Sequence, residues 1–89
     1  MVKGTTKSGF SFEIDPSKVD DMEFLERLGA ADNDITKMPG IIAEVLGAEQ
    51  RAKLYDHMRN DSGNVPIGAT ITEFQEILTI ANESEETKN

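Results

Sequence analysis

Val45–Ile77 is the stretch that decides the fold, and it reads VLGAEQRAKLYDHMRNDSGNVPIGATITEFQEI. An amphipathic run extends to Asn60 and meets the turn-forming residues Asp61–Gly63. The next residues, Val65–Ile67, are expected to be extended because Pro66 disfavours helical backbone at the residue before it. The order predicts a helix, a tight polar turn, a short extended bridge and a second helix.

Both helices of this stretch carry one apolar stripe. The first is expected to turn Leu54, Tyr55 and Met58 inward, with charged side chains facing solvent. Thr70 and Glu73 form a capping box at the start of the second helix. Its core face is expected to consist of Ile71, Phe74, Ile77, Leu78 and Ala81. Residues 83–89 are polar and lack a helix cap, so they are predicted to form a flexible acidic tail.

A further helix is predicted after Asp15-Pro16, a good cap residue followed by a proline suited to the first turn. Ser17 with Asp20 offers a rival start. Gly29 is expected to end this helix. Its apolar residues recur at every third position, with Phe24 beside them: Val19, Met22, Leu25 and Leu28.

Another helix is predicted between Asp34, which can cap it, and Gly47, which separates it from the helix that follows. Pro39 fits only the first turn, so the regular helix is expected to begin near Met38. Its stripe consists of Ile35, Met38, Ile42, Val45 and Leu46.

Residues 2–14 have the pattern of a β-hairpin. Phe10, Phe12 and Ile14 alternate with polar residues, Lys7–Gly9 supplies a turn, and Val2–Thr6 can form the partner strand. A two-stranded hairpin is marginal alone, so its apolar face must lie on the helices or its edge must pair with another chain. The sequence therefore predicts a mainly α, small four-helix domain over residues 1–82 with a short N-terminal β-hairpin.

The composition limits the classes of function. The formal net charge is −8, which disfavours nucleic acid and anionic membranes as direct partners. The chain has no cysteine, so it has neither disulfides nor a cysteine-based zinc site. Its apolar runs are far shorter than the ~20 residues that span a bilayer, and no signal peptide is visible.

The sequence offers no set of side chains typical of an enzyme. His57 is the only histidine, and it has no nearby partner for nucleophilic catalysis or zinc binding. Two segments, around Asp32 and Asp61, resemble the start of a calcium loop, but their registers place Lys37 and Ala69 where essential positions fall. We expect no catalytic residue, no cofactor and no metal site.

The methionines, together with two phenylalanines, offer the best candidates for partner binding, because flexible thioether side chains suit an adaptable groove. Packing in the core is the alternative role for the same side chains. The candidates for partner binding are Met22, Phe24, Met38 and Met58.

The order of elements resembles the small tail assembly chaperones of long-tailed phages and prophages. The resemblance covers roughly residues 8–81. It rests on Ser8–Asp15 leading into Asp20–Glu26, on Val45–Gln50, on Leu54–Arg59, and on Asp61–Pro66 with its Asp-x-Gly-x-Val-Pro motif. It implies a non-enzymatic protein that binds the tape measure protein and keeps it soluble in the host cytoplasm while the tail forms. It also implies absence from the mature virion and, in some copies, a longer frameshifted form.

Two other expectations accompany this one. The exposed edge of the hairpin offers a route to a homo-oligomer. The charge of −8 also suits a small acidic inhibitor or DNA mimic that binds a basic protein, although the carboxylates form no regular array. Strong salt dependence of binding would distinguish the inhibitor from a chaperone that uses apolar contacts.

Overall fold

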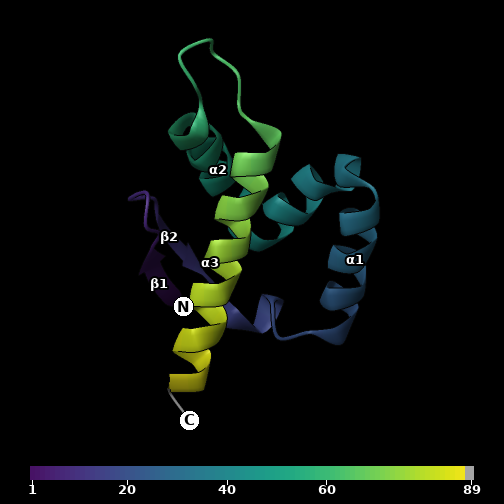
Figure 1. Cartoon of the computed structure of the whole chain (residues 1–89). Helices are drawn as coiled ribbons and strands as arrows, with labels where there is room; N and C mark the ends of the chain where they lie inside the picture. Colours follow the sequence, from purple (N-terminus) through teal and green to yellow (C-terminus); the bar gives the residue numbers. More distant parts are fainter. Residues whose placement is uncertain (88–89) are drawn as a thin grey trace.

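The computed structural model describes residues 1–87, with side chains through residue 83. It is mostly helical, with a two-stranded antiparallel sheet at the N-terminus (Figure 1). In chain order the elements are β1 (Val2–Thr5), β2 (Ser11–Ile14), the 3₁₀ turn η1 (Pro16–Lys18), α1 (Met22–Asn33), η2 (Ile35–Lys37), α2 (Met38–Met58) and α3 (Ile67–Thr87). Within the described residues, no helix is both long and apolar enough to cross a membrane.

The expected count of four helices is not confirmed, because the described chain has three α-helices. The second and third expected helices form one element, α2, whose helical backbone is interrupted at Gly47. Gly47 has φ 82° and ψ 161°, a conformation that glycine adopts without the clash a Cβ would cause. The glycine therefore kinks α2 into two limbs, which are joined without a separate loop.

The helix starts depend on aspartate caps. The Asp15 side chain caps only the short turn η1, and α1 begins later, with Asp21 as its cap. The expected end of that helix at Gly29 is wrong, since α1 continues to Asn33. Asp34 caps η2, which leads directly into α2 at Met38, as the position of the proline predicted.

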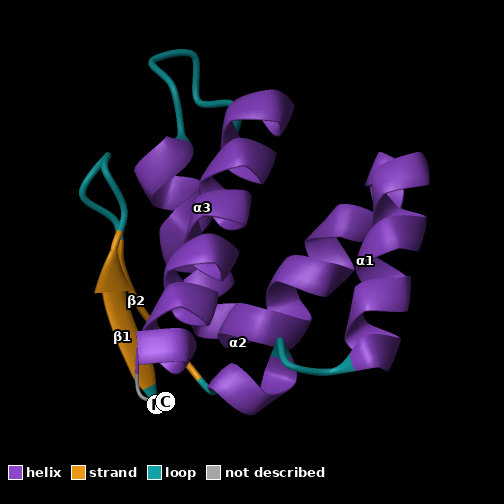
Figure 2. Ribbon diagram, turned by 60° about the horizontal axis from the view of Figure 1, so that its bottom comes forward, coloured by secondary structure: helices purple, strands orange, loops and turns teal. Residues whose placement is uncertain are grey.

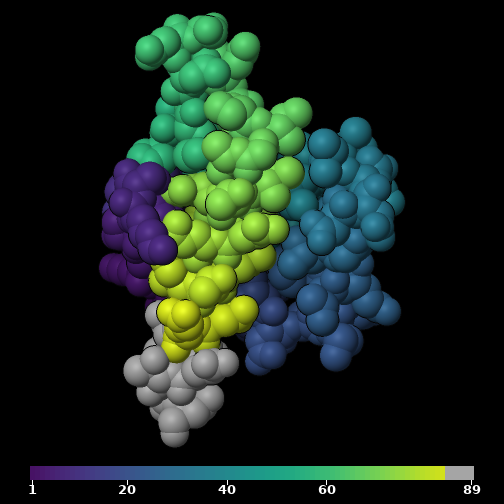
Figure 3. Space-filling view, viewed as in Figure 1, coloured from purple at the N-terminus to yellow at the C-terminus, as the bar shows by residue number. Residues whose placement is uncertain are grey.

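The core lies between the hairpin and the helices α1, α2 and α3. β1 packs against α3 and β2 against α2, while α1 contacts α2 on the other side (Figure 2). Leu54, Phe74 and Ile77 are fully buried, which confirms their expected place in the core. In Figure 3 the hairpin (purple) lies directly beside the yellow-green part of α3.

Gly4 of β1 lies tightly against Phe12 of β2 and Ile80 of α3. A Cβ built at this position would lie 2.7 Å from Phe12 Cζ and 2.8 Å from Ile80 Cγ2. The hairpin can therefore rest on α3 only because residue 4 has no side chain.

The expected flexible tail at residues 83–89 overlaps the last turns of α3, which is assigned through Thr87. Residues 88–89 lie outside the described residues.

Candidate functional site

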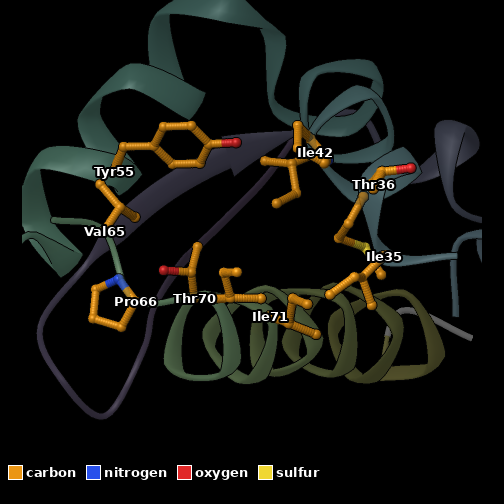
Figure 4. A pocket seen from close by; sticks show the side chains of 11 residues that line it. Ile35, Thr36, Ile42, Tyr55, Val65, Pro66, Thr70 and Ile71 are labelled. Carbon is orange, nitrogen blue, oxygen red and sulfur yellow. The ribbon is translucent and has the colours of Figure 1, made fainter.

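An apolar groove lies where η2, both limbs of α2 and the start of α3 meet. Its volume is about 330 Å³. Tyr55 and Ile42 of α2 face Thr70 and Ile71 of α3 across it (Figure 4). The groove is closed at its two ends by side chains from η2 and from the bridge before α3: Ile35, Thr36, Val65 and Pro66.

The rim of the groove is exposed although its floor is buried. Ile35 is 50% exposed and Ile67 is 64% exposed, whereas Met38 and Ile42 on the floor are buried. A small protein gains stability by burying large aliphatic side chains, so two isoleucines left in water beside one groove mark a surface suited to apolar contact.

The groove contains few polar groups. The Oγ1 atom of Thr70 is buried and has no hydrogen-bond partner. The guanidinium of Arg51 lies 5.9 Å from the centre of the Tyr55 ring, and it donates to the Pro39 carbonyl over 3.2 Å. A positive charge therefore lies beside the groove in a protein that is otherwise strongly acidic.

Only one of the four candidates for partner binding, Met38, lines this groove. Phe24 is buried in the core, and Met58 is packed against it. Met22 is 73% exposed on α1. Sequence reasoning missed the other lining residues, Ile67 and Tyr55 among them, because local patterns do not reveal which apolar residues the rest of the fold leaves uncovered.

A second constellation joins the hairpin turn to the helices. The hydroxyls of Thr6 and Ser8 both donate to Glu73 Oε2, over 2.5 and 2.7 Å. Ser8 Oγ also lies 2.9 Å from His57 Nε2. The Phe10 ring stacks at a tilt against the His57 ring, with 5.5 Å between their centres. Glu73 is a buried carboxylate, and these hydroxyls replace the water that it loses on folding.

The direction of these hydrogen bonds decides what the cluster can do. Ser8 has one hydroxyl proton, which goes to the Glu73 carboxylate. His57 Nε2 must then carry a proton and donate it to Ser8 Oγ. A histidine that donates to the serine cannot accept its proton, so this is not the arrangement of a serine nucleophile with its base. The cluster instead attaches the hairpin turn to α2 and α3.

The remaining charged groups stabilise local structure. Hydrogen bonds from the Ser17 hydroxyl and peptide N–H lower the pKa of Asp15, and Thr36 lowers the pKa of Asp34 in the same way. A two-point ion pair, with its shorter contact at 2.7 Å, joins Arg27 to Glu44 and raises the pKa of the guanidinium. In the part of the chain that the structure describes, no three acidic or histidine side chains are grouped to hold a metal ion.

Comparison with known proteins adds no relative: no protein-family model, curated protein or solved structure matches the chain. The groove and the hairpin cluster are therefore interpreted from their own geometry.

Proposed function

We propose that this protein is a non-enzymatic tail assembly chaperone that binds a tape measure protein and keeps it soluble in the host cytoplasm before the tail forms. It is proposed to act in several copies and to be absent from the mature virion. The proposal is supported by the resemblance over roughly residues 8–81 and by the form of the groove. The groove is the main structural observation in support of this proposal.

The groove suits one apolar face of a helix. A pocket of about 330 Å³ accommodates a few aliphatic or aromatic side chains, which is the amount that one stretch of an amphipathic helix presents. Ile35 and Ile67 at the rim extend the apolar contact beyond the pocket. Covering such stripes on a long helical protein would prevent those stripes from associating with one another.

The test is co-expression with the tape measure protein of the same phage, followed by measurement of its soluble fraction. The chaperone with Ile35→Ser and Ile67→Ser is expected to leave most of the partner insoluble, while the unchanged protein keeps it soluble. Both changes are at exposed positions, so the variant is expected to fold normally, which a melting curve checks.

A matched control uses two exposed apolar residues outside the groove. Met22 is 73% exposed and Leu25 is 57% exposed, both on α1. Met22→Ser with Leu25→Ser is expected to keep full solubilising activity. Equal loss in both double variants would show that general surface hydrophobicity, and not the groove, is responsible.

The net charge of −8 favours a second candidate, an acidic inhibitor or DNA mimic of a basic protein. Binding of that kind weakens steeply with ionic strength, whereas apolar contact in the groove survives moderate salt. If the tape measure protein precipitates as fully with the chaperone as without it, this candidate becomes the better one.

A further inference from the structure

The outer backbone edge of β1 is open. In an antiparallel pair, residues alternate between positions that bond to each other and positions whose peptide groups point away from the partner strand. Glu13 is of the second kind, because its N–H and C=O both bond to the side-chain amide of Gln50, over 2.8 and 2.7 Å. Lys3 lies opposite Glu13, so its peptide groups point outward on the other side.

The hairpin turn gives the same alternation independently. The N–H of Thr6 donates to the Phe10 carbonyl over 2.9 Å, so this pair is bonded. The adjacent pair, Thr5 and Ser11, must then point outward. β1 therefore directs the N–H and C=O groups of Lys3 and Thr5 away from β2.

Side chains occupy the outward positions at Glu13 and Lys7. On the β2 side, the Gln50 side-chain amide forms hydrogen bonds with both the N–H and the C=O of Glu13. Beyond the end of β1, the Glu76 carboxylate accepts a hydrogen bond from the N–H of Lys7 over 2.7 Å. The outward peptide groups of Lys3 and Thr5 have no such partner among the described residues. β1 also lies at the outer side of the molecule in both ribbon views (Figures 1 and 2).

We infer that a second copy of this chain pairs with this edge. The two β1 strands would run antiparallel about a two-fold axis at Gly4. Lys3 would exchange two hydrogen bonds with Thr5 of the partner subunit, and Thr5 would do the same with Lys3 of the partner subunit. The result is a four-stranded sheet across the dimer.

The edge can pair with its own copy in a single register. Its open positions, Lys3 and Thr5, are symmetric about Gly4, so this register satisfies the outward groups of both copies. That register places each Lys3 side chain opposite a threonine, whereas a register shifted to pair Lys3 with its own copy would place like charges directly opposite. Gln50 occupies the β2 edge at Glu13, so the assembly stops at two copies and does not grow into a fibre.

The inference is independent of the groove and of what the groove binds. The dimer is expected to have a salt dependence of its own, because each copy has a net charge of −8. Screening reduces repulsion between the two copies, so the dimer is expected to tighten as salt increases. The paired edge is short, and the dimer is therefore expected to be weak.

Sedimentation equilibrium of the full chain, over a range of concentrations up to about 1 mM, tests the pairing. The wild-type protein is expected to show a monomer–dimer equilibrium. Thr5→Pro removes an outward N–H without breaking a backbone hydrogen bond between β1 and β2, and it is expected to raise the dissociation constant at least tenfold.

The matched control is Ser11→Pro, which makes the same change at the directly opposite residue on the β2 edge. It removes the same side-chain contact between Thr5 and Ser11, and it is expected to leave the dimer intact. A wild-type protein that stays monomeric throughout the range, or equal effects of the two proline variants, would overturn the inference.

Cross-linking tests the register. Lys3→Cys and Thr5→Cys proteins, when mixed and oxidised, are expected to form a disulfide between subunits, because directly paired residues lie within reach of each other. Thr5→Cys alone is expected to cross-link poorly, since two copies of residue 5 are offset by two residues, or roughly 7 Å, along the strands. Efficient cross-linking of the single variant would exclude a two-fold axis at Gly4.

Discussion

The two sides of the α2–α3 pair differ in how far the rest of the chain covers them. On one side the hairpin packs against α2 and α3, and its turn supplies hydroxyls for the buried Glu73 carboxylate. On the other side Tyr55 and Thr70 line an open groove, and the Thr70 hydroxyl has no partner. The covered side has satisfied its polar groups and the open side has not, which is the difference expected between a stabilising interface and a binding surface.

Leu54→Ala is expected to have the largest effect on stability, a loss of about 2–5 kcal/mol in the free energy of unfolding, because it opens a cavity in the buried core. Urea denaturation measures this. Tyr55→Ala, one residue along, lines the open groove and is expected to cost less. Equal losses would show that the groove is as much a part of the core as the covered side.

Glu73→Ala is expected to cost about 1–3 kcal/mol, because it leaves the hydroxyls of Thr6 and Ser8 without their acceptor. Hydrogen exchange should localise the loss to the hairpin turn. Glu76→Ala is a suitable comparison, since Glu76 accepts only from the Lys7 peptide at an exposed position, and it is expected to cost less. No loss in the Glu73 variant would contradict the role assigned to the cluster.

Thr70→Val replaces a buried hydroxyl that has no partner with a methyl group of similar shape. The free energy of unfolding is expected to stay constant or to rise by up to about 1 kcal/mol, which thermal unfolding can detect. A clear loss of stability would mean that the hydroxyl has a partner, such as an ordered water in the groove.

Asp34→Asn is expected to have the smallest effect, visible only in the pH dependence of stability. The pKa of Asp34 is lowered from its ordinary value of 3.8 in the folded protein, by hydrogen bonds from Thr36. Its charged form therefore stabilises the fold above that value, and this contribution is lost as the pH falls through the lower folded pKa. Unfolding curves from pH 7 to about pH 2 should show a shallower decline for the asparagine variant.

Much of the fold was predictable because its signals are local. The alternation of Phe10, Phe12 and Ile14 gave the strand, and the stripe of Phe74 and Ile77 gave the core face of α3. The number of helices was not predictable in this way. A glycine between two helical patterns is compatible with a loop or with a kink, and the backbone angles at Gly47 show a kink.

The sequence by itself determined a small acidic helical domain with a hairpin, since periodicity and caps act over a few residues. Only the tertiary structure decided that Ser8 meets His57, 49 residues away, and Glu73, 65 residues away. It also decided that Ile67 borders a groove and that Gln50 occupies one edge of the hairpin. These features depend on which faces of distant elements come together, and local sequence patterns do not determine those contacts.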